Sequence, residues 1–433
     1  MKKKRNTGRF RPGKDDGMLT WLVILFQFSA MLLLAFRKET VDRQALYLSV
    51  IMPAVTVLTL KGLPKIWRVD RTILSMVMML CSVSVVTLSA IARAAITPLT
   101  QAIYIGVGLV VMMIAIAFIR WIKNWKSWNW FMILASFGLL AAPLVIGSVV
   151  NGAKNWIIFK AGGVTIFSLQ PSEFVKVSLI FILASMLPGK RTLRETFFPL
   201  LVSAGLCGVL LLQKDLGALL LYFFTTLIMH FAATSNLAVT GLGAAAGGCG
   251  AVAAYHMFEY LQRRIAAFVN PWIDPSDSGH QIIQALVAIG SGGWLGMGLG
   301  LGLPRNIPLY SSDFIYAAIC EEFGFAFALM LLAIYAIIVL RGISIAMNAR
   351  NSFHALLSFG IVTMLGLQTL LIVGGNIRLI PLTGVTLPFI AEGGSSLAGY
   401  MAAIGLLLGV SSLNDDADEQ DRRRAEWQED GQA

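Results

Sequence analysis

The sequence predicts an all-α membrane protein whose chain crosses the bilayer about twelve times. Of its 433 residues, 57% are hydrophobic and only 13% are charged, whereas soluble domains are roughly 45 to 50% apolar and about 25% charged. Apolar runs near the ~20 residues that a helix needs to cross a ~30 Å hydrocarbon core recur along the whole chain. Together these observations indicate a polytopic bundle of helices.

Twelve apolar runs alternate with polar or charged connections. An even number of spans places both chain ends on one side of the membrane, and about 22 of the 34 Lys and Arg residues fall in the two tails and in the loops on that side. We therefore expect both termini to be cytoplasmic. The runs cover residues 18–36, 44–60, 73–92, 99–119, 129–150, 171–187, 196–213, 216–233, 237–257, 314–340, 354–373 and 385–410.

The two ends of the chain are polar. Residues 1–17 form a basic tail before the first span, and the absence of a small-residue cleavage site predicts an uncleaved signal anchor. Residues 413–433 carry charges of both signs, which predicts a disordered cytoplasmic tail. The net charge is +11, and the basic residues lie in short loops between apolar spans rather than on one clustered face. A role in orienting the protein in the membrane therefore explains these residues better than binding to nucleic acid does.

The sequence predicts neither a disulfide nor a metal cage. The four cysteines all lie in apolar segments. Neither they nor the four histidines have the spacing that holds zinc. The cysteines are Cys81, Cys207, Cys249 and Cys320.

Two loops on the outer side are long enough to build structure of their own. They cover residues 151–170 and 258–313, and a structureless loop as long as the second is uncommon in compact domains. Residues 290–302 are glycine-rich, but they follow no strand and lack the G-x-G-x-x-G spacing of a nucleotide site. We therefore expect the second loop to be ordered and functional.

Acidic residues gather at the outer end of the tenth span. Asp313 stands directly before this span, and Glu321 and Glu322 lie within it. A charged side chain in a membrane helix costs about 2.5 to 3.5 kcal/mol, so such acids are expected to have a function. The alternative for Asp313 is that it merely caps the helix.

Further charged residues lie at the outer ends of other spans. Glu173 and Lys176 share one helical face, where they form either a structural ion pair or a contact to substrate. Asp215, before the eighth span, is either a functional acid or a helix cap. In the long loop, Arg263 and Arg264 either hold a diphosphate or form a solvated pair.

Six motifs lie in the outer loops and at the outer ends of the spans. They are Asn151–Trp156, Gln170–Lys176, Asp215–Gly217, Ile289–Gly293, Asp313–Tyr316 with Glu321–Gly324, and Pro381–Phe389. Their residues and their order resemble those of the shape, elongation, division and sporulation (SEDS) family. The resemblance covers residues 70–412 and implies a ten-helix core, which makes residues 18–69 two additional N-terminal helices. Lys214 stands where the family usually has proline.

The resemblance implies a glycosyltransferase of the bacterial cytoplasmic membrane that polymerises lipid II into glycan strands at the outer face. In this family the acid that matches Asp313 is catalytic, and the pair that matches Glu173 and Lys176 supports it. The acid that matches Asp215 is functionally sensitive, and the arginine that matches Arg264 lies in the active groove. Further supporting or substrate-binding candidates are Glu321, Glu322, Trp156 and Gln281.

This chemistry suits a site outside the cytoplasm. Nucleotide sugars are absent there, so the donor must be a lipid-linked diphosphate, and one carboxylate is enough to take the acceptor's proton. Arg264 supplies positive charge to the leaving diphosphate, with Arg263 or a divalent cation as further sources, and no cofactor is certain. In this family an α-linked donor gives a β-linked product, which implies inversion. The resemblance also implies a class B penicillin-binding protein as partner.

Two functions of other classes compete with this one. The first is a lipid II flippase or transporter, which predicts charges near the membrane midplane and broken helices in paired halves. The second is a non-catalytic scaffold of the division or elongation machinery, which has no need of Asp313 together with Glu173. The sequence does not distinguish elongation, division and sporulation.

Overall fold

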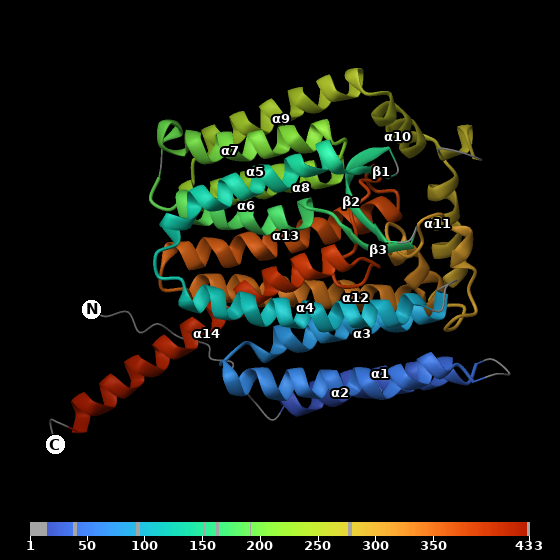
Figure 1. Ribbon diagram of the computed structural model, residues 1–433, viewed down its shortest axis with the longest axis horizontal. Coiled ribbons are helices and arrows are strands. Elements are labelled where there is room, and N and C mark those ends of the chain that lie inside the picture. Colours follow the sequence, from blue (N-terminus) through green and yellow to red (C-terminus); the bar gives the residue numbers. More distant parts are fainter. Residues whose placement is uncertain are drawn as a thin grey trace.

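The chain forms a bundle of long helices, with a small sheet and several short helices gathered at one end (Figure 1). The computed structural model describes residues 15–37, 41–91, 96–150, 152–161, 164–190, 192–275 and 279–430. In these ranges, eleven helices are long and apolar enough to cross a membrane. The predicted polytopic α-helical membrane protein is confirmed.

The long helices coincide with the predicted apolar runs. A long apolar run predicts a helix reliably, although it predicts the first and last residues of that helix less well. The long helices are α1 (Asp15–Ala35), α2 (Arg43–Ile66), α3 (Arg71–Ile91), α4 (Ile96–Trp121), α5 (Asn129–Ile146), α6 (Ser172–Met186), α7 (Leu193–Leu212), α8 (Leu216–Thr234), α9 (Leu237–Met257), α12 (Ile315–Asn348), α13 (Ser352–Asn376) and α14 (Gly394–Asp430).

Helix α6 corrects the predicted number of spans, since it is not among the eleven. It has 15 residues and therefore rises about 22 Å, less than the ~30 Å of hydrocarbon. Pro171 stands before its first residue, and Pro188 and Gly189 follow its last turn. Prolines at these positions limit a helix at both ends.

Three strands lie beside the helices of this all-α membrane fold, in the segment that was expected to be an outer loop. β1 (Ser148–Val150), β2 (Ala153–Ala161) and β3 (Val164–Leu169) form an antiparallel sheet in the order β1-β2-β3. The valine, isoleucine, threonine and aromatic residues of this segment favour strands. The predicted outer loop at 151–170 is therefore largely a sheet.

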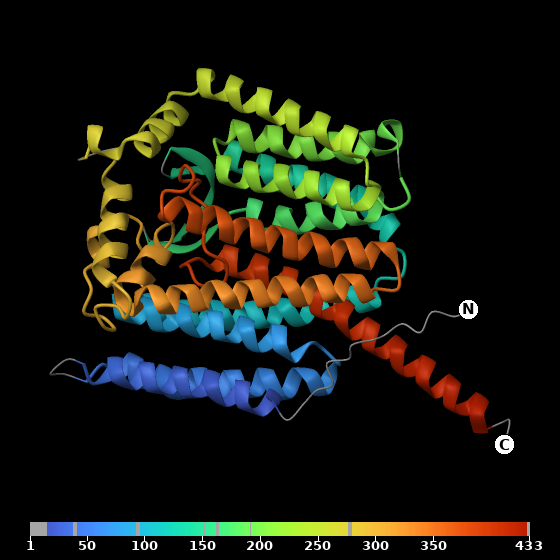
Figure 2. The same ribbon diagram turned by 180° about the vertical axis from the view of Figure 1, so that it is seen from behind.

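The predicted loop at 258–313 is ordered over most of its length. It lies across the same end of the bundle as the sheet (Figures 1 and 2). Its glycine-rich part is fastened to α12, because the amides of Met297 and Gly298 donate to the carbonyls of Glu321 and Glu322 at 2.8 and 3.1 Å. The helices of this segment are α10 (Glu259–Val269), η2 (Pro271–Ile273), α11 (His280–Gly292) and η3 (Pro304–Asn306).

Helices α1 and α2 form a hairpin that packs on the rest of the bundle. The side-chain amide of Gln27 donates to Thr56 Oγ1 at 2.8 Å and to Ser82 Oγ at 2.6 Å. One buried side chain thus joins α1, α2 and α3. In addition, Phe26 stacks on Phe327 of α12, with 6.0 Å between the ring centroids.

Helix α14 extends beyond the bundle at the end opposite the sheet, where α1 also begins (Figures 1 and 2). This helix corrects the prediction of a disordered tail, because it continues to Asp430. Its charged part pairs with residues that end or connect other helices. Arg120 lies 2.8 Å from Asp416, and Arg350 lies 2.6 Å from Asp421.

Candidate active site

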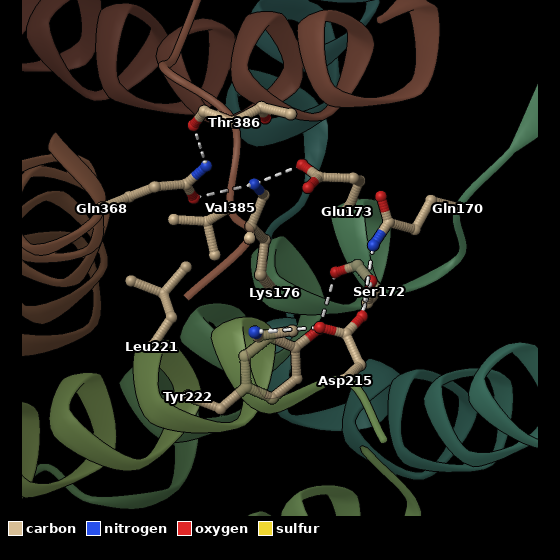
Figure 3. Close-up of a pocket in the computed structure, with 12 residues that line it drawn as sticks. Gln170, Ser172, Glu173, Lys176, Asp215, Leu221, Tyr222, Gln368, Val385 and Thr386 are labelled. Atoms are coloured by element: carbon tan, nitrogen blue, oxygen red, sulfur yellow. Dashed lines mark hydrogen bonds and ion pairs between the residues drawn. The ribbon is translucent and has the colours of Figure 1, made fainter. Parts of the chain in front are cut away.

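A buried polar cluster lies where α6 and α8 begin, at the sheet end of the bundle (Figure 3). Its side chains come from α6, α8, α13 and the segment between α13 and α14. They surround a cavity of about 20 Å³, which has room for about one water molecule. The cavity is thus too small for a larger ligand, and the cluster consists mainly of contacts between these parts of the chain.

Asp215 is both a helix cap and the centre of a hydrogen-bond network. Its Oδ1 accepts from the amide of Ala218 at 3.1 Å, which caps α8. Its Oδ2 accepts from Asn155 of β2 at 2.8 Å, from Gln170 at 3.2 Å and from Ser172 at 3.4 Å. One carboxylate thus ties the sheet to the starts of α6 and α8.

The predicted ion pair between Glu173 and Lys176 is present and buried, with exposed fractions of 8% and 3%. The Lys176 ammonium also donates to Gln368 Oε1 at 3.3 Å and lies 3.9 Å from the centroid of the Tyr400 ring. A carboxylate, an amide oxygen and an aromatic face enclose this cation. These contacts favour the structural interpretation of the pair.

Gln368 connects the ion pair to the segment that precedes α14. Its Oε1 also accepts from the Tyr400 hydroxyl, and its Nε2 donates to the carbonyl of Thr386 at 2.7 Å (Figure 3). The same segment approaches the start of α8 so closely that a β-carbon at Gly217 would lie 2.6 Å from the carbonyl oxygen of Thr383. The close packing of these parts thus requires glycine at 217.

Asp313 and Arg264 converge on this segment from outside the cluster. A β-carbon at Gly384 would lie 3.7 Å from Asp313 Oδ2 and 3.8 Å from Arg264 Nη2. Arg264 Nη1 also donates to the carbonyl of Thr383 at 3.5 Å. Because Gly384 lines the polar cluster as well, the segment lies between the cluster and the pair formed by Asp313 and Arg264.

Asp313 does not cap α12, so the simpler interpretation of this residue is wrong. The cap is Asn376 of α13, whose Oδ1 accepts from the amide of Ala317 at 3.1 Å and whose Nδ2 donates to the carbonyl of Asp313 at 2.8 Å. Within the described ranges, no side chain next to the start of α12 makes the usual cap bond. Asn376 therefore holds the Asp313 backbone and leaves its carboxylate for another role.

The environment of Asp313 changes its acidity. The side chain is half-buried, and this burial raises the pKa of the carboxyl to about 6, against the opposing effects of a hydrogen bond from Ser312 and the charge of Arg264. A base is most effective when its pKa lies near the working pH. Asp313 thus has the acidity of a general base.

Glu321 and Glu322 lie about two turns into α12 and hold the glycine-rich turn instead of joining Asp313. Glu321 Oε1 accepts from the amide of Leu303 at 3.0 Å, and Glu322 Oε2 accepts from the amide of Gly300. Both side chains are buried. Their contacts indicate a structural role.

Three other predicted residues lie apart from the pair formed by Asp313 and Arg264. Arg263 pairs with Glu259 on the exposed face of α10, at 3.6 Å. Trp156 is half-buried in β2, and Gln281 is half-buried in the first turn of α11. In the part of the chain that the structure describes, no hydrogen bond joins either side chain to the pair.

Asn155, Gln368, Tyr400 and Asn376 are the residues that sequence reasoning missed. Gln368 and Asn376 are polar residues in an apolar span, which is the signal that identifies such positions. Over the described residues, no three His, Cys, Asp or Glu side chains gather as a metal site. The divalent cation stays a prediction.

The fold and this site define a polytopic membrane protein with an aspartate and an arginine at one end of its bundle. The sequence profile of the FtsW/RodA/SpoVE family, described as cell cycle proteins, matches residues 63–415. The chain therefore belongs to this family, the SEDS family. Residues 15–62, which include α1 and most of α2, lie outside the match.

Relatives and solved structures agree with this assignment. Stage V sporulation protein E of Bacillus subtilis is 36% identical over 322 residues, covering 72% of this chain and 86% of the relative. The peptidoglycan glycosyltransferase RodA of Mycobacterium tuberculosis is 33% identical over 330 residues, covering 72% and 69%. The crystal structure of Thermus thermophilus RodA has a TM-score of 0.57 at 26% identity, covering 79% and 96%. A chain from a peptidoglycan synthase complex has a TM-score of 0.68 at 26% identity, covering 80% and 98%.

Proposed function

We propose that this chain is a peptidoglycan glycosyltransferase that polymerises lipid II into glycan strands at the outer face of the cytoplasmic membrane. The observation that carries the proposal is the convergence of the Asp313 carboxylate and the Arg264 guanidinium on Gly384. An acid and a cation at one backbone position supply the base and the leaving-group contact that transfer from a diphosphate needs. A relative with peptidoglycan glycosyltransferase in its name supports the reaction class.

In the proposed reaction, Asp313 takes the proton of the acceptor hydroxyl as its oxygen attacks the donor sugar. The bond from that sugar to the diphosphate breaks, and undecaprenyl diphosphate leaves with the electron pair. Arg264 holds the diphosphate oxygens through charge-assisted hydrogen bonds. Direct displacement by one base gives inversion at the anomeric carbon.

The buried cluster has a positioning role in this proposal. Gln368 joins the ion pair of Glu173 and Lys176 to Thr386, two residues after Gly384. Asp215 anchors the start of α8, against which the same segment packs. The cluster thereby sets the distance between the base and the cation, and reaction rates are sensitive to misplacements of about 1 Å.

We place both termini in the cytoplasm and the site outside it. The excess of Lys and Arg in the tails and in the loops on their side supports this orientation. The described ends of the chain, at α1 and α14, lie opposite the sheet and the candidate site (Figure 1). In this proposed orientation, Asp313 faces the side on which lipid-linked donors are available and nucleotide sugars are not.

A class B penicillin-binding protein is the proposed partner. A structurally similar chain comes from a peptidoglycan synthase complex that coordinates polymerisation and crosslinking. Such a partner would bring one transmembrane helix, which docks on a lipid-facing surface of small or complementary side chains.

Incubation of the purified protein with lipid II, with and without class B proteins of its host, tests the function. The expected result is long glycan chains. Transbilayer movement of lipid II in vesicles without any glycan would instead support the flippase. A protein that does neither alone or with any of these partners would support the scaffold.

A further inference from the structure

The α1–α2 hairpin lies mostly outside the family profile, yet it is built into the core. Gln27 is 1% exposed, and its amide is hydrogen-bonded to both Thr56 and Ser82. A buried amide that lost these partners would incur the full cost of desolvation. The hairpin is therefore held in one position on α3.

One charged residue of the hairpin reaches the turn that leads to Asp313. Arg37 lies two residues beyond the end of α1, and this helix ends beside the segment between α11 and α12 (Figures 1 and 2). Its guanidinium occupies the space that a side chain on Gly300 would need. The amide of Gly300 donates to Glu322 Oε2. Arg37 and Glu322, whose side chains carry opposite charges, thus contact the same glycine.

The glutamates of α12 hold one end of the segment that carries Asp313. Glu321 accepts from the amide of Leu303 at 3.0 Å. From there the chain runs through η3 to Asp313, whose carbonyl oxygen is held by Asn376 at 2.8 Å. The segment is therefore fastened at both ends, and one fastening depends on the buried carboxylates.

We propose that Arg37 is a positioning residue for Asp313 and that the hairpin braces the glycine-rich turn during glycosyl transfer. The inference rests on the proposed function. An uncompensated carboxylate in a membrane helix is costly, and Arg37 supplies the opposite charge that keeps Glu322 bound to Gly300. In the described structure Arg37 Nη1 has no hydrogen-bond partner, which fits a role through charge and contact.

The Arg37→Gln variant, assayed as the full chain with its partner, tests the proposal. Turnover of lipid II should fall about tenfold while KM changes less than about twofold, because positioning acts on the transition state. Amide hydrogen exchange at Gly298, Gly300 and Leu303 should become faster. Arg37→Lys keeps the charge and should recover most of the turnover. Arg43→Gln, which removes an exposed charge from the same hairpin, should change neither measurement.

Parental turnover and exchange in Arg37→Gln would overturn the proposal, and so would equal losses in Arg43→Gln. If Arg37→Gln fails to fold, Arg37→Met replaces it, because methionine keeps an apolar side chain in the same place and removes the positive charge. Slower turnover with faster exchange at Leu303 is then expected, and a parental result would overturn the proposal. A parent that makes no glycan contradicts the proposed function instead, and the exchange measurements still decide the role of Arg37.

Discussion

Two aspartates near the starts of apolar helices differ in what their carboxylates do. Asp215 directly precedes α8, whereas Asp313 lies two residues before α12. Asp215 accepts from the first turn of its own helix, whereas at α12 that bond is made by Asn376, a residue from another helix. Both local sequences have an aspartate near the start of an apolar run, so both residues are identified as candidates from the chain alone. The cap of α12 depends on a contact between Asn376 and Ala317, which lie far apart in the sequence. Sequence spacing therefore does not predict which of the two aspartates caps a helix.

The ion pair of Glu173 and Lys176 could be predicted from the sequence, because it depends only on local spacing along one helix. Residues three positions apart on a helix lie on one face whatever the rest of the chain does, and the structure has this pair. Its connection through Gln368 to Thr386 joins α6 to residues far along the chain, and no local pattern contains it.

Asp313→Asn is expected to abolish polymerisation and to leave the fold intact. A neutral amide cannot take the acceptor's proton, and lost acid–base catalysis alone lowers a rate by about 10² to 10⁴. The helix start is unaffected, since Asn376 caps it. The measurement is glycan formation by parent and variant at equal folded concentration. More than about a tenth of the parental rate in the variant would contradict the catalytic role.

Turnover is expected to rise with pH through about 6, the pKa of the Asp313 carboxyl. Only the ionised carboxylate accepts a proton, so each pH unit below this pKa lowers turnover about tenfold. The check is turnover at saturating lipid II over a series of buffers from about pH 5 to about pH 8, with intrinsic fluorescence as a control for unfolding. A flat profile would show that another group is the base.

At the scale of elements, apolar runs predict the helices well and the connections poorly. A run of twenty apolar residues has few alternatives to a membrane helix. The strands at 148–169 and the short α6 depend on β-branched residues and on flanking prolines within a few positions, where the helical signal is weak. Lys214 has a φ of +61, which proline cannot adopt, so the connection before α8 also departs from the family pattern.

Asn376→Ala is expected to lower turnover by more than a control variant that loses a similar amount of folding stability. The change removes the cap of α12 and the hydrogen bond that holds the Asp313 carbonyl. Asn351→Ala is the matched control, because Asn351 caps the other end of α13 by accepting from His354 at 2.7 Å. Each loses about 1 kcal/mol of capping, measured as a shift in thermal unfolding.

Only Asn376→Ala is expected to lower glycan formation, by about 10-fold or more if the base is misplaced. The assay compares both variants with the parent at equal folded concentration. Equal activities in the two variants would show that the anchor on the Asp313 backbone is dispensable.

The whole molecule separates its charges by end. The acids and arginines of the candidate site lie at the sheet end, whereas the ion pairs of α14 with Arg120 and Arg350 lie at the opposite end. Counting Lys and Arg along the chain predicts this polarity because orientation depends on short loops. It does not predict that residues 414–430 lengthen a helix, since two of their pairing partners, Arg120 and Arg350, lie at the end of another helix and in a connection between helices.

Reporter fusions should show the predicted topology. Fusions at Ser127 and Lys190 are expected to read inside, and fusions at Lys160 and Ser278 outside, because of the Lys and Arg bias. Ser127 lies in the short helix η1 (Trp125–Trp128) before α5 and Lys160 lies in β2, while Ser278 lies outside the described residues. A cytoplasmic signal from the fusion at Lys160 would mean that the sheet end, with the acids of the candidate site, faces the cytoplasm. This result would refute the proposed orientation.

The shortness of α6 is possible because protein surrounds it. Eleven of its 15 residues are buried, so the thickness of the hydrocarbon does not set its length as it does for a helix that faces lipid. Backbone that is not helical is tolerated at membrane depth only where protein or a water-filled cavity surrounds it, and the connection from β3 to α6 meets this condition beside the polar cluster. A helix that stops short thus leaves room within the bundle for the hydrogen bonds of Asp215 and Gln170.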